Sequence, residues 1–221
     1  MNRTILTTAL SIAFAISANA NTVLSSALTA PDSFNLTGLT QVAFTKGPMT
    51  VPASPNSTFT AIFDAGVYAD PNNVFGAGDY DFVYQVSDTG TGTAPGSQGI
   101  IANITAAFFS GFSTDAGIDT NATAPTGFTA GGGVPLNDNL SSGVVEFNFT
   151  PNITVGTHSA ILVVETNATN YTTGLLSAID GSVGTATAYA PASAPEPGTL
   201  FLVGAALCGV GLIKRNRKSA L

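Results

Sequence analysis

Cysteine is almost missing from this chain of 221 residues, because the only one, Cys208, lies in an apolar run near the C-terminus. The body of the chain, residues 21–194, therefore contains no thiol. This excludes disulfides, thiolate catalysis and cysteine-based zinc sites in the body, and with them the class of small disulfide-rich secreted modules. Apolar burial and hydrogen bonds must hold the body, with bound cations as a further source of stability.

Positive charge is equally scarce. Of the 6 lysines and arginines, only Lys46 lies in the body, whereas every acidic residue except Glu196 lies there. The body is therefore more acidic than the net charge of −7 suggests. Nucleic acids are bound by clustered lysine and arginine, so nucleic-acid binding is excluded.

Histidine occurs once and tryptophan is absent. His158 follows a turn, and because no Gly-x-Ser-x-Gly elbow is present, an exposed histidine is favoured over a Ser-His-Asp triad. Glu146 and Glu165 lie in adjacent predicted strands and could pair as glycosidase carboxylates. Both alternate with apolar neighbours, which favours solvent-facing positions, and no tryptophan is available for sugar stacking. We expect no enzyme and no catalytic residues.

The N-terminus has the three parts of a secretory signal peptide. Arg3 supplies the positive charge, residues 5–17 form a short apolar stretch, and Ala18-Asn19-Ala20 is a small-x-small cleavage site. The sequence therefore predicts a signal peptide over residues 1–20, export through the secretion translocon, and a mature protein that begins at Asn21.

The C-terminus also has three parts. Pro195-Glu196-Pro197 comes first, an uncharged run over residues 200–213 follows, and a basic cluster ends the chain at Lys214, Arg215, Arg217 and Lys218. The two prolines favour an extended, accessible segment around Glu196. Residues 199–213 are long enough for a thin or tilted membrane span, and the basic cluster would stay on the cytoplasmic side as a stop-transfer signal. The body is then expected outside the cell.

This tail resembles the PEP-CTERM sorting signal. The resemblance implies an exosortase substrate, from bacteria that make exopolysaccharide, in which Pro195, Glu196 and Pro197 are the recognition residues. Residues 80–86, 112–115 and 165–174 are similar to segments of uncharacterised PEP-CTERM proteins. The implied route is a membrane-anchored intermediate, then processing at residues 195–221 and delivery to the cell surface or extracellular matrix, with exopolysaccharide as a possible partner. A plain single-span anchor that is never cleaved is the alternative.

The body has the alternating pattern of β-strands. In residues 80–87 the even positions are apolar, and residues 145–150 alternate in the same way. Further strands are expected at residues 39–44, 58–63, 100–109, 158–165 and 185–190, with Gly, Asn, Asp and Pro turns between them. The sequence predicts an all-β protein, a single β-sandwich or jelly roll over residues 21–185, and a flexible stalk over residues 186–194.

The role of this domain stays open between a structural matrix component and a calcium- or carbohydrate-binding module. Calcium candidates are the pair Asp79 and Asp81 and the pair Asp115 and Asp119, although no Asp-x-Asp-x-Asp-Gly loop occurs and acidic loops often only solvate a surface. No other metal or cofactor is predicted. A carbohydrate-binding module would expose tyrosines, for which the candidates are Tyr68, Tyr84 and Tyr171.

Overall fold

The computed structural model describes residues 24–51 and 57–192. The predicted signal peptide, the Pro195-Glu196-Pro197 motif, the apolar run and the basic tail lie outside the described residues. Within the two described ranges the chain forms no helix, and so none that could span a membrane.

The described residues form two β-sheets, which confirms the all-β prediction. One sheet has six strands in the order β1-β6-β9-β4-β3-β2, and the other has five in the order β11-β10-β5-β8-β7. The strands are β1 (Asp32–Phe34), β2 (Thr40–Pro48), β3 (Phe59–Ala69), β4 (Tyr80–Thr91), β5 (Ile100–Ala107), β6 (Thr114–Asp119), β7 (Pro135–Ser141), β8 (Val144–Thr154), β9 (Leu162–Thr166), β10 (Asn170–Asp180) and β11 (Ser182–Ala192).

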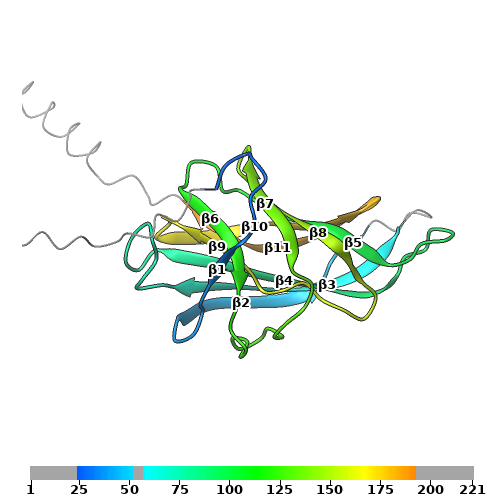
Figure 1. Ribbon diagram of the computed structural model, residues 1–221, viewed down its shortest axis with the longest axis horizontal. Coiled ribbons are helices and arrows are strands. Elements are labelled where there is room, and N and C mark those ends of the chain that lie inside the picture. The colour runs from blue at the N-terminus through cyan, green and yellow to red at the C-terminus, as the bar shows by residue number, and fades with distance from the viewer. Residues whose placement is uncertain (1–23, 52–56, 193–221) are drawn as a thin grey trace, which may run out of the picture.

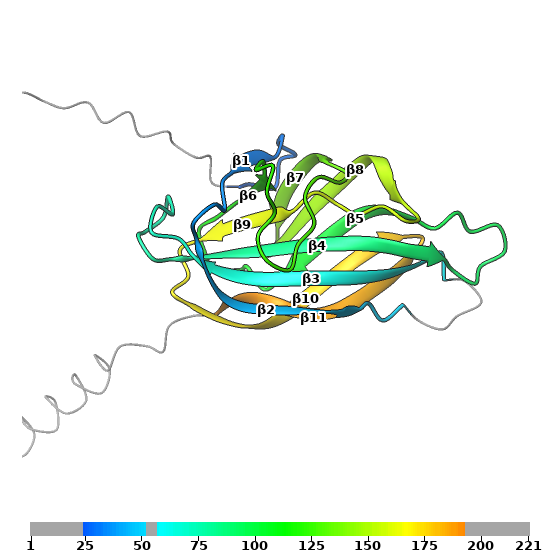
Figure 2. The same cartoon turned by 90° about the horizontal axis from the view of Figure 1, so that it is seen from below.

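The two sheets pack face to face around one apolar core, consistent with the predicted β-sandwich (Figure 1, Figure 2). The even positions of β4 point into this core, as the alternation predicts, and Phe82 and Tyr84 are fully buried. Across the core they face the five-stranded sheet, which contributes Ile104, Phe147 and Leu176. The Tyr84 hydroxyl donates to the carbonyl oxygen of Tyr189 in β11 at 2.6 Å, which joins the two sheets.

Part of the outer face of the six-stranded sheet is buried as well. A second apolar cluster there combines Val83 of β4, Val163 of β9 and Phe34 of β1 with Leu36, which follows β1. The β6–β7 loop, residues 120–134, crosses the same face and contributes Phe128. The first odd positions of β4, Asp81, Val83 and Gln85, are therefore buried, including the two polar ones.

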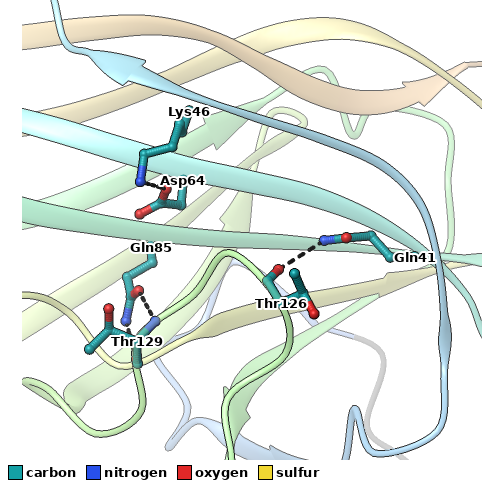
Figure 3. A network of polar contacts seen from close by, with 6 residues as sticks. All are labelled: Gln41, Lys46, Asp64, Gln85, Thr126 and Thr129. Atoms are coloured by element: carbon teal, nitrogen blue, oxygen red, sulfur yellow. Dashed lines mark hydrogen bonds and ion pairs between the residues drawn. The ribbon is translucent and has the colours of Figure 1, made fainter.

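Two amides hold this loop to the sheet (Figure 3). The carboxamide of Gln85 donates to the Thr129 carbonyl at 2.8 Å and accepts from the Thr129 N–H at 2.9 Å. Gln41 in β2 donates to the Thr126 carbonyl at 3.2 Å. The loop is thus fixed at two points.

The stalk prediction is wrong for residues 186–192, which belong to β11; residues 193–194 lie outside the described residues. β11 pairs with β10 along its whole length, from Ser182 to Ala192. Its alternate residues Ala186, Ala188 and Ala190 are buried in the core. Small side chains that suggested a linker are in fact the inward face of a strand, so the folded body continues past the predicted boundary at residue 185.

Candidate metal centre

Three buried carboxyl groups meet at one end of the six-stranded sheet. Asp81 in β4 lies directly opposite Glu165 in β9 in the antiparallel pairing, so both side chains project from the same face. Asp70 follows the last residue of β3, the neighbouring strand. One oxygen from each of the three lies within 4.8 Å of the others. The side chains are only 6%, 1% and 6% exposed, for Asp70, Asp81 and Glu165 respectively.

The β3–β4 loop, residues 70–79, holds Asp70 in place through local hydrogen bonds. The Asp70 carboxylate accepts from the Asn72 backbone N–H at 2.7 Å, an Asx turn, and its carbonyl accepts from the Gly78 N–H at 2.9 Å. Asn73, also buried, donates through Nδ2 to Asp81 Oδ1 at 2.9 Å and to the Thr166 carbonyl at 3.2 Å. The loop therefore folds back onto β4 and β9 and closes the group on one side.

No positive side chain compensates this group. Lys46 is the only lysine or arginine in the described residues, and its Nζ lies 3.3 Å from Asp64. Burial, followed by the charges of Glu165 and Asp70, raises the pKa of Asp81 to about 9. Burial, followed by the charges of Asp70 and Asp115, raises the pKa of Glu165 to about 7. Buried like charges are unfavourable, so these carboxyls must hold protons or share a cation.

One carboxylate oxygen of Glu165 is free to bind a ligand. Its carboxylate accepts from the Val74 backbone N–H, whereas Oε2 is buried and has no hydrogen-bond partner among the described residues. An open cavity of about 330 Å³ adjoins the group. Its walls are largely hydroxyl, amide and carboxyl groups, from Ser33, Phe34, Asn35, Thr37, Leu39, Asp70, Asn72 and Glu165. An ion therefore has an entry path and room to keep water ligands.

The donor set fits a calcium ion. Calcium takes six to eight oxygen ligands at 2.3–2.6 Å, so ligands on opposite sides of one ion lie about 5 Å apart. Three oxygens within 4.8 Å of one another satisfy that limit. No histidine or cysteine belongs to the group, which disfavours zinc and copper. Magnesium needs near-ideal octahedral geometry, whereas calcium accepts flexible arrangements of oxygen ligands.

The four calcium candidates from the sequence fall in different places. Asp81 belongs to the group, but with Asp70 and Glu165 as its neighbours instead of Asp79. Asp79 closes the β3–β4 loop, where its carbonyl accepts from the Asp70 N–H at 3.2 Å. Asp115 lies in β6 directly opposite Glu165, next to the group.

Asp119 lies at the far end of β6 and is engaged locally. Its Oδ1 accepts from Asn121 Nδ2 at 2.6 Å and from the Asn121 backbone N–H at 3.2 Å. Asp115 and Asp119 therefore do not form the ligand pair that the sequence suggested.

The two glutamates considered as a glycosidase pair are far apart in the topology. β8, which carries Glu146, belongs to the five-stranded sheet, and β9, which carries Glu165, to the six-stranded sheet. The expectation that they lie on adjacent strands is wrong, because the chain crosses between sheets after β8. Glu146 accepts from Asn103 Nδ2 at 2.8 Å. The expectation that Glu165 faces solvent is also wrong, since the β3–β4 loop covers it.

His158 is part of the contacts around the β6–β7 loop. Its Nδ1 lies 3.1 Å from the Gln85 carboxamide nitrogen and 2.9 Å from the Ser159 carbonyl oxygen. The ring therefore lies among amide groups, beside the side chain that fixes Thr129. Its position is not that of a base paired with a serine hydroxyl and an orienting carboxylate.

The tyrosines suggested for carbohydrate stacking are mostly enclosed. Tyr68 and Tyr84 are buried, so they offer no face to a sugar. Tyr171 in β10 is 37% exposed, and it packs edge-to-face against Tyr80 and Tyr189 with ring centroids 5.8 and 5.6 Å away. Of the three candidates, only Tyr171 keeps a partly exposed ring that a sugar could contact.

Scans against protein-family models, curated proteins and solved structures give no match to this chain. The geometry of the centre and the two chain ends therefore carry the functional proposal.

The sequence contains a signal for Asp70, which was not among the calcium candidates. Oxygen-bearing side chains crowd residues 70–81, with Asp70, Asn72, Asn73, Asp79 and Asp81 within one turn and the start of a strand.

Proposed function

We propose that this chain is an exported, non-enzymatic protein of the cell surface or extracellular matrix whose β-sandwich binds calcium through Asp70, Asp81 and Glu165. The observation that carries the calcium site is the meeting of three buried carboxyls, while the one lysine of the described residues pairs with Asp64. The unpartnered Oε2 of Glu165 and the adjoining polar cavity support it.

The chain ends support the proposed location. A signal peptide and a PEP-CTERM-like tail both direct the body outside the cell. Calcium there is abundant enough to fill sites of modest affinity, and extracellular calcium modules bind with dissociation constants of about 10⁻⁴–10⁻³ M. A body without disulfides gains from such an ion the stability that crosslinks would otherwise supply.

Calorimetric titration of the mature exported protein with calcium tests the site. We expect saturable binding that Asp81→Asn weakens at least tenfold, because one charged ligand becomes a neutral one. Asp180→Asn, at the β10–β11 turn, is the matched control and should bind as the wild type does. A wild-type protein that binds no calcium up to 10 times the upper end of that range, about 10⁻² M, would contradict the proposal.

Mass spectrometry of the C-terminal peptide tests the proposed sorting. In the native host we expect the exported protein to lose everything beyond the Pro195-Glu196-Pro197 region, and only when the exosortase is present. A C-terminus that ends at Leu221 with and without the enzyme would instead identify a plain single-span anchor. The calcium site does not depend on this outcome.

A further inference from the structure

A cavity of about 480 Å³ lies at one end of the β2–β3 pair, where two loops meet the six-stranded sheet. One wall is the turn over residues 36–39, which connects β1 to β2, and the other is residues 123–126 of the β6–β7 loop. Gln41 and Tyr68, directly opposite each other in the β2–β3 pairing, line the cavity between these walls. Its volume lies within the range of about 300–1,000 Å³ that is typical of small-molecule sites.

Local hydrogen bonds hold the two walls in place. A backbone hydrogen bond of 3.3 Å joins the ends of the turn over residues 36–39, and Gly38 has a φ of 83°, which glycine adopts without strain. A β-bulge follows Gln41, and bulges re-aim neighbouring side chains. The Gln41 Nε2 donates to the Tyr68 hydroxyl at 2.9 Å and to the Thr126 carbonyl at 3.2 Å (Figure 3). One carboxamide therefore joins the sheet to the loop, so the cavity does not need a ligand to form.

Several polar groups in the lining keep unused hydrogen-bonding capacity. Tyr68 is only 2% exposed, and its hydroxyl accepts from Gln41 while its own hydrogen has no acceptor among the described residues. Burial raises the pKa of Tyr68 to about 12, so this hydroxyl is a donor at neutral pH. The hydroxyls of Thr37, Thr123 and Thr126 make no hydrogen bond within residues 24–51 and 57–192. Donors in folded proteins are almost always satisfied when buried, so the Tyr68 hydrogen indicates an acceptor that the protein does not supply.

The character of the lining decides the class of ligand. Among the described residues that line the cavity, none is charged, so an ionic ligand would find no counter-charge there. Apolar side chains lie beside the hydroxyls, from Leu36, Leu39, Ala124 and Pro125. A ligand must therefore be neutral, must both donate and accept hydrogen bonds, and must offer an apolar face. A sugar ring meets all three conditions, because its hydroxyls donate and accept and its C–H groups are apolar.

We propose that this cavity binds one ring of a neutral saccharide, with the Tyr68 hydroxyl as a donor to the sugar and the Gln41 carboxamide oxygen as an acceptor. That oxygen has no hydrogen-bond partner in the described part of the chain. Recognition here uses hydrogen bonds instead of aromatic stacking, since the Tyr68 ring is buried. Thr37 and Leu39 also line the cavity beside the candidate calcium centre, but no carboxyl of that centre lines this one. The inference therefore goes beyond the proposed function and does not depend on it.

Saturation-transfer difference NMR of the mature exported protein tests the site, with glucose, galactose, mannose and N-acetylglucosamine as separate probes. We expect at least one of these neutral sugars to bind, in chelator as well as in calcium, and glucuronate to bind more weakly than glucose. Tyr68→Phe keeps the ring and should weaken that sugar about tenfold, because one buried hydrogen bond is lost. Thr123→Val, at an exposed loop position, is the second variant in case the first does not fold. Tyr84→Phe, the same change in the core, is the matched control and should bind as the wild type does.

Three outcomes would overturn the inference. The first is that none of the four neutral sugars binds the wild type, and the second is that glucuronate binds as strongly as glucose. The third is a bound sugar that Tyr68→Phe and Thr123→Val leave unchanged but Tyr171→Ala removes, because the sugar would then lie on the exposed ring of the other sheet. Sugar binding by a wild type that binds no calcium would leave this inference standing and refute the calcium site alone.

Discussion

Replacing Glu165 by glutamine should change stability in opposite directions with and without calcium. Glutamine keeps an acceptor for the Val74 N–H but removes the buried charge. Raising the pKa of Glu165 from 4.5 to about 7 corresponds to about 3 kcal/mol by which its ionised form destabilises the calcium-free fold. At pH 8 and without calcium, Glu165→Gln should therefore be more stable than the wild type by up to about 3 kcal/mol. For a domain of this size that is a rise in Tm of about 6–12 °C.

Calcium should cancel or reverse this difference. A ligand at 100 times its dissociation constant stabilises the folded state by about 2.7 kcal/mol, and only the wild type keeps all three charged ligands. Thermal unfolding followed by circular dichroism, in chelator and in saturating calcium at pH 8, measures both arms. Glu146→Gln, a glutamate of the other sheet that accepts from Asn103, is the matched control and should respond to calcium as the wild type does.

Two results would refute this reasoning. If Glu165→Gln were less stable than the wild type in chelator, the glutamate charge would be compensated in the fold, and the argument from unpaired buried charge would fail. If the variant gained as much stability from calcium as the wild type, Glu165 would not be a ligand.

Three further predictions concern pH and the packing of the sandwich. In chelator, the free energy of unfolding should fall as pH rises from 5 to 8, because carboxyls with raised pKa values, such as Glu165 and Asp81, must lose their protons in the folded state. Urea titrations at both pH values measure this fall. Saturating calcium should remove most of it, since the ion compensates the charge of Glu165 and its neighbours. Tyr84→Phe should destabilise the protein by about 1–2 kcal/mol in urea unfolding, since the Tyr189 carbonyl loses a buried donor; an unchanged midpoint would mean that water replaces it. Gln85→Leu should destabilise the protein by about 2–3 kcal/mol, because the N–H and carbonyl groups of Thr129 both lose their partner. It should also speed limited proteolysis within residues 120–134. Cleavage as slow as in the wild type would show that other contacts hold the loop.

Much of the sheet structure could be predicted from local patterns. The alternation in residues 80–87 and 145–150 correctly marked parts of β4 and β8, since a strand with one face in the core leaves a period of two in its sequence. β10 was missed because its first residues, Asn170 to Gly174, are polar and turn-like, and their strand conformation depends on the long pairing with β11. β1 was not predicted for a similar reason. It has three residues, and its position depends on parallel pairing with β6, where the Asp32 backbone packs closely against Gly117.

The centre was harder to predict than the strands. Asp81 was a candidate because acidic residues crowd its turn, but its partners come from residue 70 and residue 165. No spacing rule links those positions. They meet because β9 is inserted beside β4 in the same sheet, an arrangement that no local sequence pattern encodes. Glu165 has the alternating neighbours of a solvent-facing residue, and only the covering loop makes it a buried one.

Composition and local pattern were enough to predict an all-β body without cysteine and nearly without positive charge, and chain ends typical of export and sorting. These properties follow from composition and from short-range periodicity, which act within a strand or a tail. Which carboxyls meet and which are buried depends on strand order and loop packing, because these join residues far apart in the chain. The acidic residues that composition alone would place in solvent become a candidate cation centre because the six-stranded sheet and the β3–β4 loop bury them without a neutralising lysine.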